Sequence, residues 1–331
     1  MRKLNLKIRL VCVFFVFVGM LTLAACSIWP SPGRVTSDTF SEYDLLTYGG
    51  VSALTVGPDG NVWFTIEDGN KIGRITHAGE VREYTIPTKN SLPKGIASGP
   101  DGNLWFTEHD GNKIGKITVN GAITEYPVPT AKSAPFSIVV GSDGNLWFAE
   151  TDQNKFGRIT TQGVITEFPA RDATADITTG SDGNIWYTER DLNKIGKITP
   201  KGIVTEYPVP TKASGLWGIT SGPDGNVWFT ETFVDTIGRI TPEGTISEFA
   251  LPSHGAGAND ITTGPDGNLW FIEFSTNKIG RITTQGVVTE FSYPSSAGTG
   301  EHIITGPDGN LWFNEHVYGN PDRIAWYSVR R

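Results

Sequence analysis

Short apolar runs separated by turn sequences make up most of the chain. In residues 95–130, GIAS leads into the turn GPDGN, LWFTE follows, and two further turns bring KIGKIT and ITEYPVPT. Runs of this length, bounded by Gly, Pro, Asp and Asn, are typical of β-strands. Because no segment of helical length shows the apolar period of an amphipathic helix, the pattern predicts units of four short antiparallel strands.

This unit occurs seven times. A GPDGN or GSDGN turn, with a Trp two residues after its Asn, returns about every 42 residues. The turns begin at Gly57, Gly99, Gly141, Gly180, Gly222, Gly264 and Gly306. The repeat predicts an all-β fold, a seven-bladed β-propeller with four-stranded blades over residues 38–331. In such a ring we expect the repeated Trp residues between blades and the repeated Asp residues in turns, since one Asp per loop is too few ligands for calcium.

The seventh unit is incomplete at its C-terminal end. After Trp312 the chain has residues for only two strands of the last blade, the second of which ends at Trp326. Residues 41–45, Ser-Glu-Tyr-Asp-Leu, resemble the Thr-Glu-Tyr-Pro-Val of the other outer strands. We therefore expect the N-terminal strand to close the last blade, which leaves no open sheet edge.

Residues 1–25 have the features of a lipoprotein signal peptide. A basic start precedes an apolar run over residues 10–23, and Leu-Ala-Ala precedes Cys26. The run is too short for a typical membrane-spanning helix, so a transmembrane anchor is the weaker interpretation. We expect lipidation of Cys26, a tether over residues 26–37, and an exported, cell-envelope lipoprotein whose only contact with the membrane is its lipid anchor.

Composition and charge narrow the possible partners. The chain has 27 Lys and Arg against 35 Asp and Glu, and the predicted signal carries Arg2, Lys3, Lys7 and Arg9. The remaining chain is therefore strongly acidic, which argues against nucleic acid as a partner. Of the two Cys residues only Cys26 would remain, so no disulfide is expected. We expect a monomer.

Residues that differ among the repeats gather at one end of the predicted channel. Two positions before the apolar Ile or Leu of each inner strand, the sequence places Ser52, Lys94, Phe136, Ala175, Trp217, Asn259 and His302. The second strands end in Glu108, Glu150, Glu189, Glu231, Glu273 and Glu315. Six carboxylates around one mouth would suit a cation or a basic ligand. The alternative is that each Glu forms a structural ion pair with a Lys or Arg of the next strand.

The last blade has the densest group of reactive side chains. Glu301 and His302 begin its inner strand, and Glu315 and His316 end its second strand. Two imidazoles and two carboxylates at one mouth would suit acid–base chemistry or a divalent metal. The alternative is that they are ordinary surface residues without a function.

The repeat strings GPDGNLWFTE, NKIGRIT and ITEYPVPT resemble those of the virginiamycin B lyase family over nearly all of residues 41–327. The resemblance implies a mouth that binds a cyclic depsipeptide and opens its ester by elimination, with a His as base and Mg²⁺ held by carboxylates. It assigns His302 and Glu315 to catalysis and Glu315 to the metal, with Glu301 as a substitute ligand. Asn259 stands in place of a second family His, Gly300 in place of a metal-binding Glu, and Ser52 in place of an aromatic residue.

Two functions follow from these observations. The first is a Mg²⁺-dependent lyase acting on a streptogramin B or related cyclic depsipeptide at the mouth that holds His302 and Glu315. The second is a non-catalytic surface protein that binds a peptide or glycan. In either case the partner is a small cyclic peptide or other small ligand, bound by Lys94, Phe136, Trp217, Asn259 and His316.

Overall fold

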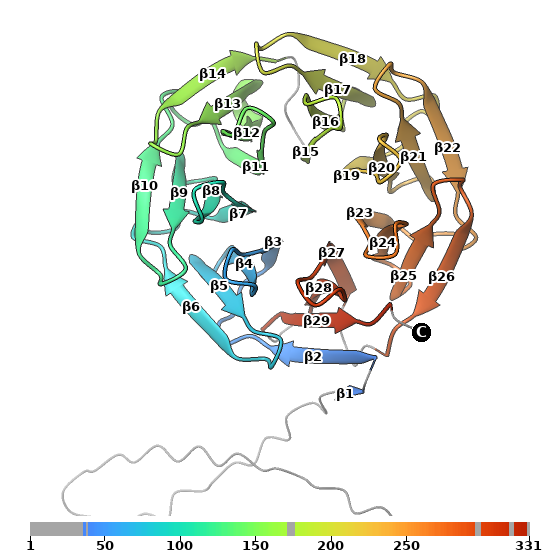
Figure 1. Cartoon of the computed structure of the whole chain (residues 1–331), viewed down its shortest axis with the longest axis horizontal. Coiled ribbons are helices and arrows are strands. Elements are labelled where there is room, and N and C mark those ends of the chain that lie inside the picture. The colour runs from blue at the N-terminus through green and yellow to red at the C-terminus, as the bar shows by residue number, and fades with distance from the viewer. Residues whose placement is uncertain (1–35, 38, 171–175, 295–298, 318–320, 330–331) are drawn as a thin grey trace, which may run out of the picture.

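A computed structural model describes residues 36–37, 39–170, 176–294, 299–317 and 321–329. The predicted signal peptide, Cys26 and most of the predicted tether lie outside these residues. Seven antiparallel sheets stand in a ring around a central channel, with one strand of each sheet innermost (Figure 1). The predicted seven-bladed propeller is confirmed. No helix within the described ranges has the length and hydropathy needed to cross a lipid bilayer.

Each blade runs from an inner strand outward in chain order. The first six blades are formed, in turn, by β3 to β6 (Val51–Val56, Val62–Ile66, Lys71–Ile75, Val81–Thr85), β7 to β10 (Pro93–Ser98, Leu104–Glu108, Lys113–Ile117, Ile123–Pro127), β11 to β14 (Pro135–Val140, Leu146–Glu150, Lys155–Ile159, Ile165–Pro169), β15 to β18 (Ile177–Thr179, Ile185–Glu189, Lys194–Ile198, Val204–Pro208), β19 to β22 (Leu216–Ser221, Val227–Glu231, Thr236–Ile240, Ile246–Ala250) and β23 to β26 (Ala258–Thr263, Leu269–Glu273, Lys278–Ile282, Val288–Ser292). A single 3₁₀ turn, Thr151–Gln153, is the only helical element in the described ranges.

The seventh blade joins the two ends of the chain. From the channel outward, its strands are β27 (Thr299–Thr305), β28 (Leu311–His316), β29 (Arg323–Tyr327) and β2 (Phe40–Asp44). The expected closure by the N-terminal strand is confirmed. A short strand β1 (Thr36–Ser37) pairs with β2, so this blade has five strands where four were predicted.

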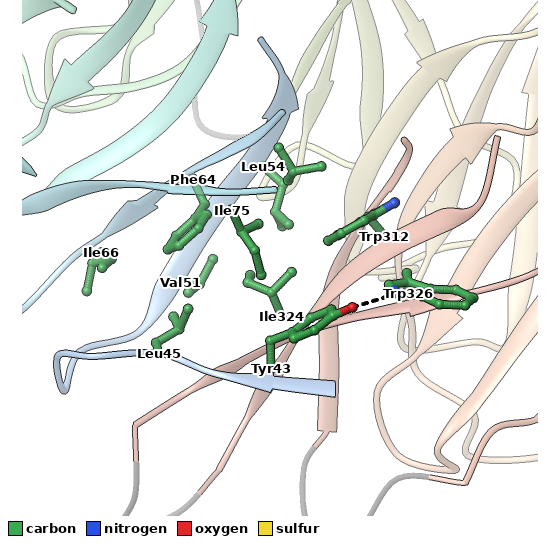
Figure 2. Packing of buried hydrophobic residues seen from close by; sticks show 11 residues of the cluster. Tyr43, Leu45, Val51, Leu54, Phe64, Ile66, Ile75, Trp312, Ile324 and Trp326 are labelled. Carbon is green, nitrogen blue, oxygen red and sulfur yellow. Dashed lines mark hydrogen bonds between the residues drawn. The ribbon is translucent and has the colours of Figure 1, made fainter. Parts of the chain in front are cut away.

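Side chains on both ends of the chain fill the seam between blades seven and one. Tyr43 stacks on Trp312 with the ring centroids 6.4 Å apart, and its hydroxyl accepts a hydrogen bond of 3.2 Å from Trp326 Nε1 (Figure 2). Arg323, almost fully buried, lies 2.9 Å from Asp44 and 3.6 Å from Glu42. Apolar packing and a buried cation therefore hold the ring closed.

The repeated turn and the repeated Trp are joined by a hydrogen bond. In blade two, Trp105 Nε1 donates to Asp101 Oδ1 over 3.0 Å, and the same bond occurs in all seven blades. Burial acts to raise the pKa of Asp101, but the bonds from Trp105 and Asn103 and the charge of Lys116 outweigh it and lower the pKa. The turn Asp residues thus anchor Trp side chains, as well as shaping the turn.

The Trp residues form the core between neighbouring blades, as the sequence predicts. Trp63 of blade one packs with Ile96, Leu104 and Phe106 of blade two. Tyr84 stacks on Trp63 at 5.7 Å, and the turn residue Gly121 of blade two lies so close to Tyr84 that a Cβ there would sit 2.2 Å from the ring. This interface is therefore filled by aromatic rings packed against backbone.

Deleting residues 36–45 should destabilise the whole ring, because it removes β1 and β2 and exposes buried Trp312 and Trp326. The loss of burial of Phe40, Tyr43 and Leu45 amounts to several kcal/mol, so we expect the melting temperature to fall by about 10 °C or more. Circular dichroism melting tests this, with a deletion of residues 27–34 as control. Equal melting of the two deletions would contradict closure by β2.

Replacing Asp101 by Ala should cost about 1–3 kcal/mol of unfolding free energy, because it leaves the buried indole N–H of Trp105 without its acceptor. Asp152→Ala, at an exposed residue, is the matched control and should change stability by less than about 0.5 kcal/mol. Urea unfolding measures both. A result in which the two variants are equally stable would show that the Asp–Trp bond contributes nothing.

Candidate functional site

The seven inner strands enclose a cavity of about 550 Å³, which we call the central cavity. Predicted residues Lys94, Phe136, Trp217, Glu301 and His302 line it, and so does Ser52. A second cavity of about 500 Å³, the side cavity, opens over blades five and six and contains Asn259. Trp217, Glu301 and His302 line both cavities. Residues from different blades therefore converge as predicted.

The register of the last blade differs from the prediction. Ile303 pairs with Phe313 in the way that Ile261 of blade six pairs with Phe271. His302 is therefore one residue before the inner-strand Ile, and Glu301 occupies the place that was predicted for His302. The hydrogen bonds confirm this shift. The backbone N–H of His302 donates to the side chain of Asn314 in β28, just as the backbone N–H of Gly218 in blade five donates to the hydroxyl of Thr230 in β20.

His302 is oriented by a carboxylate from the preceding blade. Its Nδ1 lies 3.6 Å from Asp260 Oδ2, and the same oxygen accepts the N–H of Ile303 over 3.0 Å. Burial acts to lower the pKa of His302, but the pairing with Asp260 and the charges of Glu301 and Asp176 outweigh it and raise the pKa. Because Nδ1 faces Asp260, Nε2 is the ring nitrogen left for a ligand.

A second acid, Asp176, is half-buried and lines the same cavity. Its carboxylate accepts hydrogen bonds from the hydroxyl of Ser137 over 2.7 Å and from two backbone N–H groups, those of Ile177 and Ile219. Burial, followed by the charge of Asp260, raises the pKa of Asp176 to about 6. Asp176 and Asp260 each bridge two neighbouring blades, so both acids stabilise the ring as well as giving the cavity its charge.

On the side of blades one to three the cavity has a paired cation. Lys94 Nζ lies 2.5 Å from Glu67 and 5.8 Å from the ring centroid of Phe136. Glu67 directly follows β4, and it is the residue after the strand end, not the strand end itself, that reaches the cavity. The predicted substrate-binding residues Lys94 and Phe136 are thus in contact with each other.

Glu301 interacts electrostatically with two imidazoles, those of His302 and His316. Burial raises the pKa of Glu301, and the charges of His302 and His316 act to lower it. His316 Nδ1 lies 3.0 Å from Asp322, and His316 does not line either cavity. The last blade therefore brings Glu301 and His302 to the central cavity, whereas the predicted ligand-binding residue His316 lies outside both cavities and pairs with Asp322.

The predicted ring of carboxylates at the mouth is not formed. Glu108, Glu150, Glu189, Glu231, Glu273 and Glu315 are fully buried, and none of them lines either cavity. The predicted structural alternative also needs correction, because Lys155 at the start of the third strand pairs with Glu167 of the outer strand, and Lys71, Lys113, Lys194 and Lys278 pair in the same way. The strand-end carboxyl groups lie beneath these ion pairs.

Glu315 and Glu301 lie in different surroundings and do not form the predicted magnesium site. The Glu315 carboxylate lies near buried Tyr293, between blades six and seven, and raises the pKa of that phenol together with burial. Across the described parts of the chain, no group of three or more His, Cys, Asp or Glu residues is placed to hold a metal ion. In these positions Glu301 and Glu315 do not fit a Mg²⁺ site.

Four charged residues of the central cavity were missed by sequence reasoning: Glu67, Asp176, Arg190 and Asp260. Two of them carry a signal in the sequence, because Asp176 and Asp260 stand directly before an inner-strand Ile, where blades one, two, three and five have Ala, Gly, Ser and Gly. Glu67 and Arg190 each follow the last residue of a second strand. The alternation of side chains along a strand does not apply there, so it does not fix the direction of these side chains.

The fold and the site define a seven-bladed propeller whose inner strands enclose a cavity lined by charged and aromatic side chains. The chain belongs to the virginiamycin B lyase family, whose model matches residues 31–176 and 169–328. A streptogramin B lyase structure is 36% identical and superimposes with a TM-score of 0.80 over 87% of this chain and 97% of that one. Comparison with curated proteins gave no match.

Virginiamycin B lyase from Staphylococcus aureus is similar at 38% identity. Its structure has a TM-score of 0.81 and covers 88% of this chain and 99% of its own. A catalytically inactive His-to-Ala variant of that enzyme, with quinupristin, has the same TM-score, identity and coverage. The likeness extends over the whole ring.

Replacing Glu150 by Gln should weaken the pH dependence of stability. Burial, with the charge of Glu167, raises the pKa of Glu150 to about 8 in the folded protein. The folded state thus binds this proton more tightly than the unfolded state, whose Glu has a pKa near 4.3. The contribution of this group to the free energy of unfolding is therefore complete below about pH 4, and it is lost as the pH rises through 8.

We therefore expect the free energy of unfolding of the wild type to rise as pH falls from 8 to 5. In Glu150→Gln this slope should decrease by up to about 1.4 kcal/mol per pH unit. Urea unfolding at several pH values measures it, and Glu80→Gln, at an exposed residue, is the control. Unchanged slope in Glu150→Gln would mean that this carboxyl is ionised in the folded protein.

Proposed function

We propose that the protein opens the ester of a cyclic depsipeptide of the streptogramin B type by elimination at the central cavity. The observation that carries the proposal is the position of His302, which lines the cavity with Nδ1 held by Asp260. A carboxylate that fixes one ring nitrogen leaves the other oriented to take a proton, as general-base catalysis requires. Family membership and the inactive His variant of the S. aureus enzyme support this chemistry.

In the proposed step, His302 Nε2 removes a proton from the carbon next to an amide carbonyl of the ligand. The electron pair forms a carbon–carbon double bond, and the bond from the neighbouring carbon to the ester oxygen breaks. The ester leaves as a carboxylate, so the ring opens without water and the product has the mass of the substrate. Phe136 and Trp217 supply apolar walls for the ligand.

A non-catalytic binding function is the second candidate. It is favoured by Asn259 and Glu301, which occupy the positions two residues before the inner-strand Ile where the family resemblance places His. In this case the cavities hold a peptide or glycan without changing it. Binding would then depend on Lys94, Phe136 and Trp217 and survive the loss of His302.

We also propose that the protein acts outside the cytoplasm as a monomer. Lipidation of Cys26 would hold it at the membrane surface, and the tether would separate the propeller from the bilayer. Metabolic labelling with a radioactive or clickable fatty acid tests this proposal. Label in the wild type but not in Cys26→Ser is the expected result.

Incubation with quinupristin should give a linear product of unchanged mass, detected by mass spectrometry, with and without Mg²⁺ and in EDTA. His302→Ala should reduce the rate by about 100-fold or more, because it removes the general base. His254→Ala, at an exposed His that lines neither cavity, is the matched control and should keep full activity. A water-added product, or equal rates in the two variants, would contradict elimination by His302.

The same ligand separates the two candidate functions. If no product forms but quinupristin raises the melting temperature of both the wild type and His302→Ala, the binding function replaces the lyase. If quinupristin gives neither product nor stabilisation, both proposals fail for this class of ligand.

A further inference from the structure

Arg190 is a cation held at a fixed place on the wall of the central cavity. It follows directly after β16 of blade four, and its Cζ lies 4.7 Å from the ring centroid of Trp217 and 5.4 Å from that of Phe233, both from blade five. Stacking against aromatic rings uses the faces of the planar guanidinium and leaves its N–H edge available. The contacts thus hold the side chain without consuming its hydrogen-bond donors.

Arg190 and Lys94, the two permanent cations that line the cavity, differ in how they are paired. Within the part of the chain that the structure describes, no Asp or Glu forms an ion pair with Arg190, whereas the other cation of the cavity, Lys94, is paired with Glu67. The acids across the cavity are occupied elsewhere: Asp176 accepts three hydrogen bonds, and Asp260 faces His302. Arg190 is therefore a half-buried cation without a carboxylate partner among the described residues.

We propose that Arg190, Trp217 and Phe233 form a subsite for a carboxylate on a ligand that carries an aromatic or other flat apolar group. A guanidinium edge binds a carboxylate through two parallel N–H···O bonds, which are stronger and more selective than bonds to a neutral amide. Phe233 is 64% exposed and also lines the side cavity, so it offers an apolar surface beside the charge.

This subsite goes beyond the elimination, because it concerns a free carboxylate and needs no ester. It is also consistent with the proposed reaction, since opening the ester by elimination leaves a carboxylate on the product. Arg190 is a binding and positioning residue in this proposal, and the removal of the proton stays with His302.

Two small probes that differ in one group test the subsite. N-acetyl-phenylalanine carries a carboxylate, and N-acetyl-phenylalanine amide carries a neutral amide in its place. Titration of the purified protein, followed by calorimetry or by ligand-observed NMR, should show at least tenfold tighter binding of the carboxylate. Arg190→Gln should bind the two probes alike, and Arg190→Lys, which keeps the charge but not the flat fork, should retain only part of the preference.

Arg82→Gln is the matched control, because it removes the same charge from an exposed position on the outer strand of blade one. It should keep the tenfold preference, and melting curves establish that each variant is folded. Equal binding of the two probes by the wild type, or an unchanged preference in Arg190→Gln, would overturn the proposal. Because neither probe contains an ester, failure of the protein to cleave quinupristin would leave this result unaffected.

Discussion

The hydrogen bond from each Trp indole to the Asp of its own turn is the interaction on which the propeller depends. It joins residues four apart, such as Asp101 and Trp105, so the turn and the second strand of a blade are fixed by a local contact. The anchored ring then fills the interface with the next blade, as Trp63 does against Leu104 and Phe106. A local bond thus sets an interface between distant residues, and a buried indole N–H without it would cost about 1–3 kcal/mol.

This arrangement leaves the beginnings of the inner strands free to vary. The contacts that repeat in the blades are the Asp–Trp bonds, the aromatic stacking and the Lys–Glu pairs, and they lie in the turn, the second strand and the outer strands. None of them uses the residue two positions before the inner-strand Ile. Blades two, three, five, six and seven place Lys94, Phe136, Trp217, Asn259 and Glu301 there. A ring of nearly identical blades therefore presents a cavity with different chemistry on each side.

The fold can be predicted from the sequence because its signals are local: the turn, the strand lengths and the repeat all lie within one unit, and even the closing strand repeats an outer-strand string. The site is less predictable. Both Ile303 and Ile304 fit the apolar position of the last inner strand, and only the pairing with Phe313 decides between them. Alternation along a strand assigns side chains to two faces, but it does not say which neighbouring element covers each face. Glu150 and its equivalents were therefore predicted to form a ring at the mouth of the channel, although they are buried. Arg190 and Glu67 follow strand ends, where no period applies.

Comparison of blades five and seven shows why the imidazole proposed as the base has room in blade seven and would have none in blade five. Asp176 of blade four accepts the N–H of Ile219, and Asp260 of blade six accepts the N–H of Ile303, so the two acids form the same bridge. Directly before these Ile residues stand Gly218 and His302. A Cβ at Gly218 would lie 2.9 Å from Asp260, which leaves no room for a side chain in blade five. In blade seven the equivalent position is occupied by an imidazole, and the bridging carboxylate faces it. The position of the proposed base is therefore set by the packing of blade six against blade seven, and a shift of one blade relative to the other would move His302 away from Asp260 as well as from the ligand.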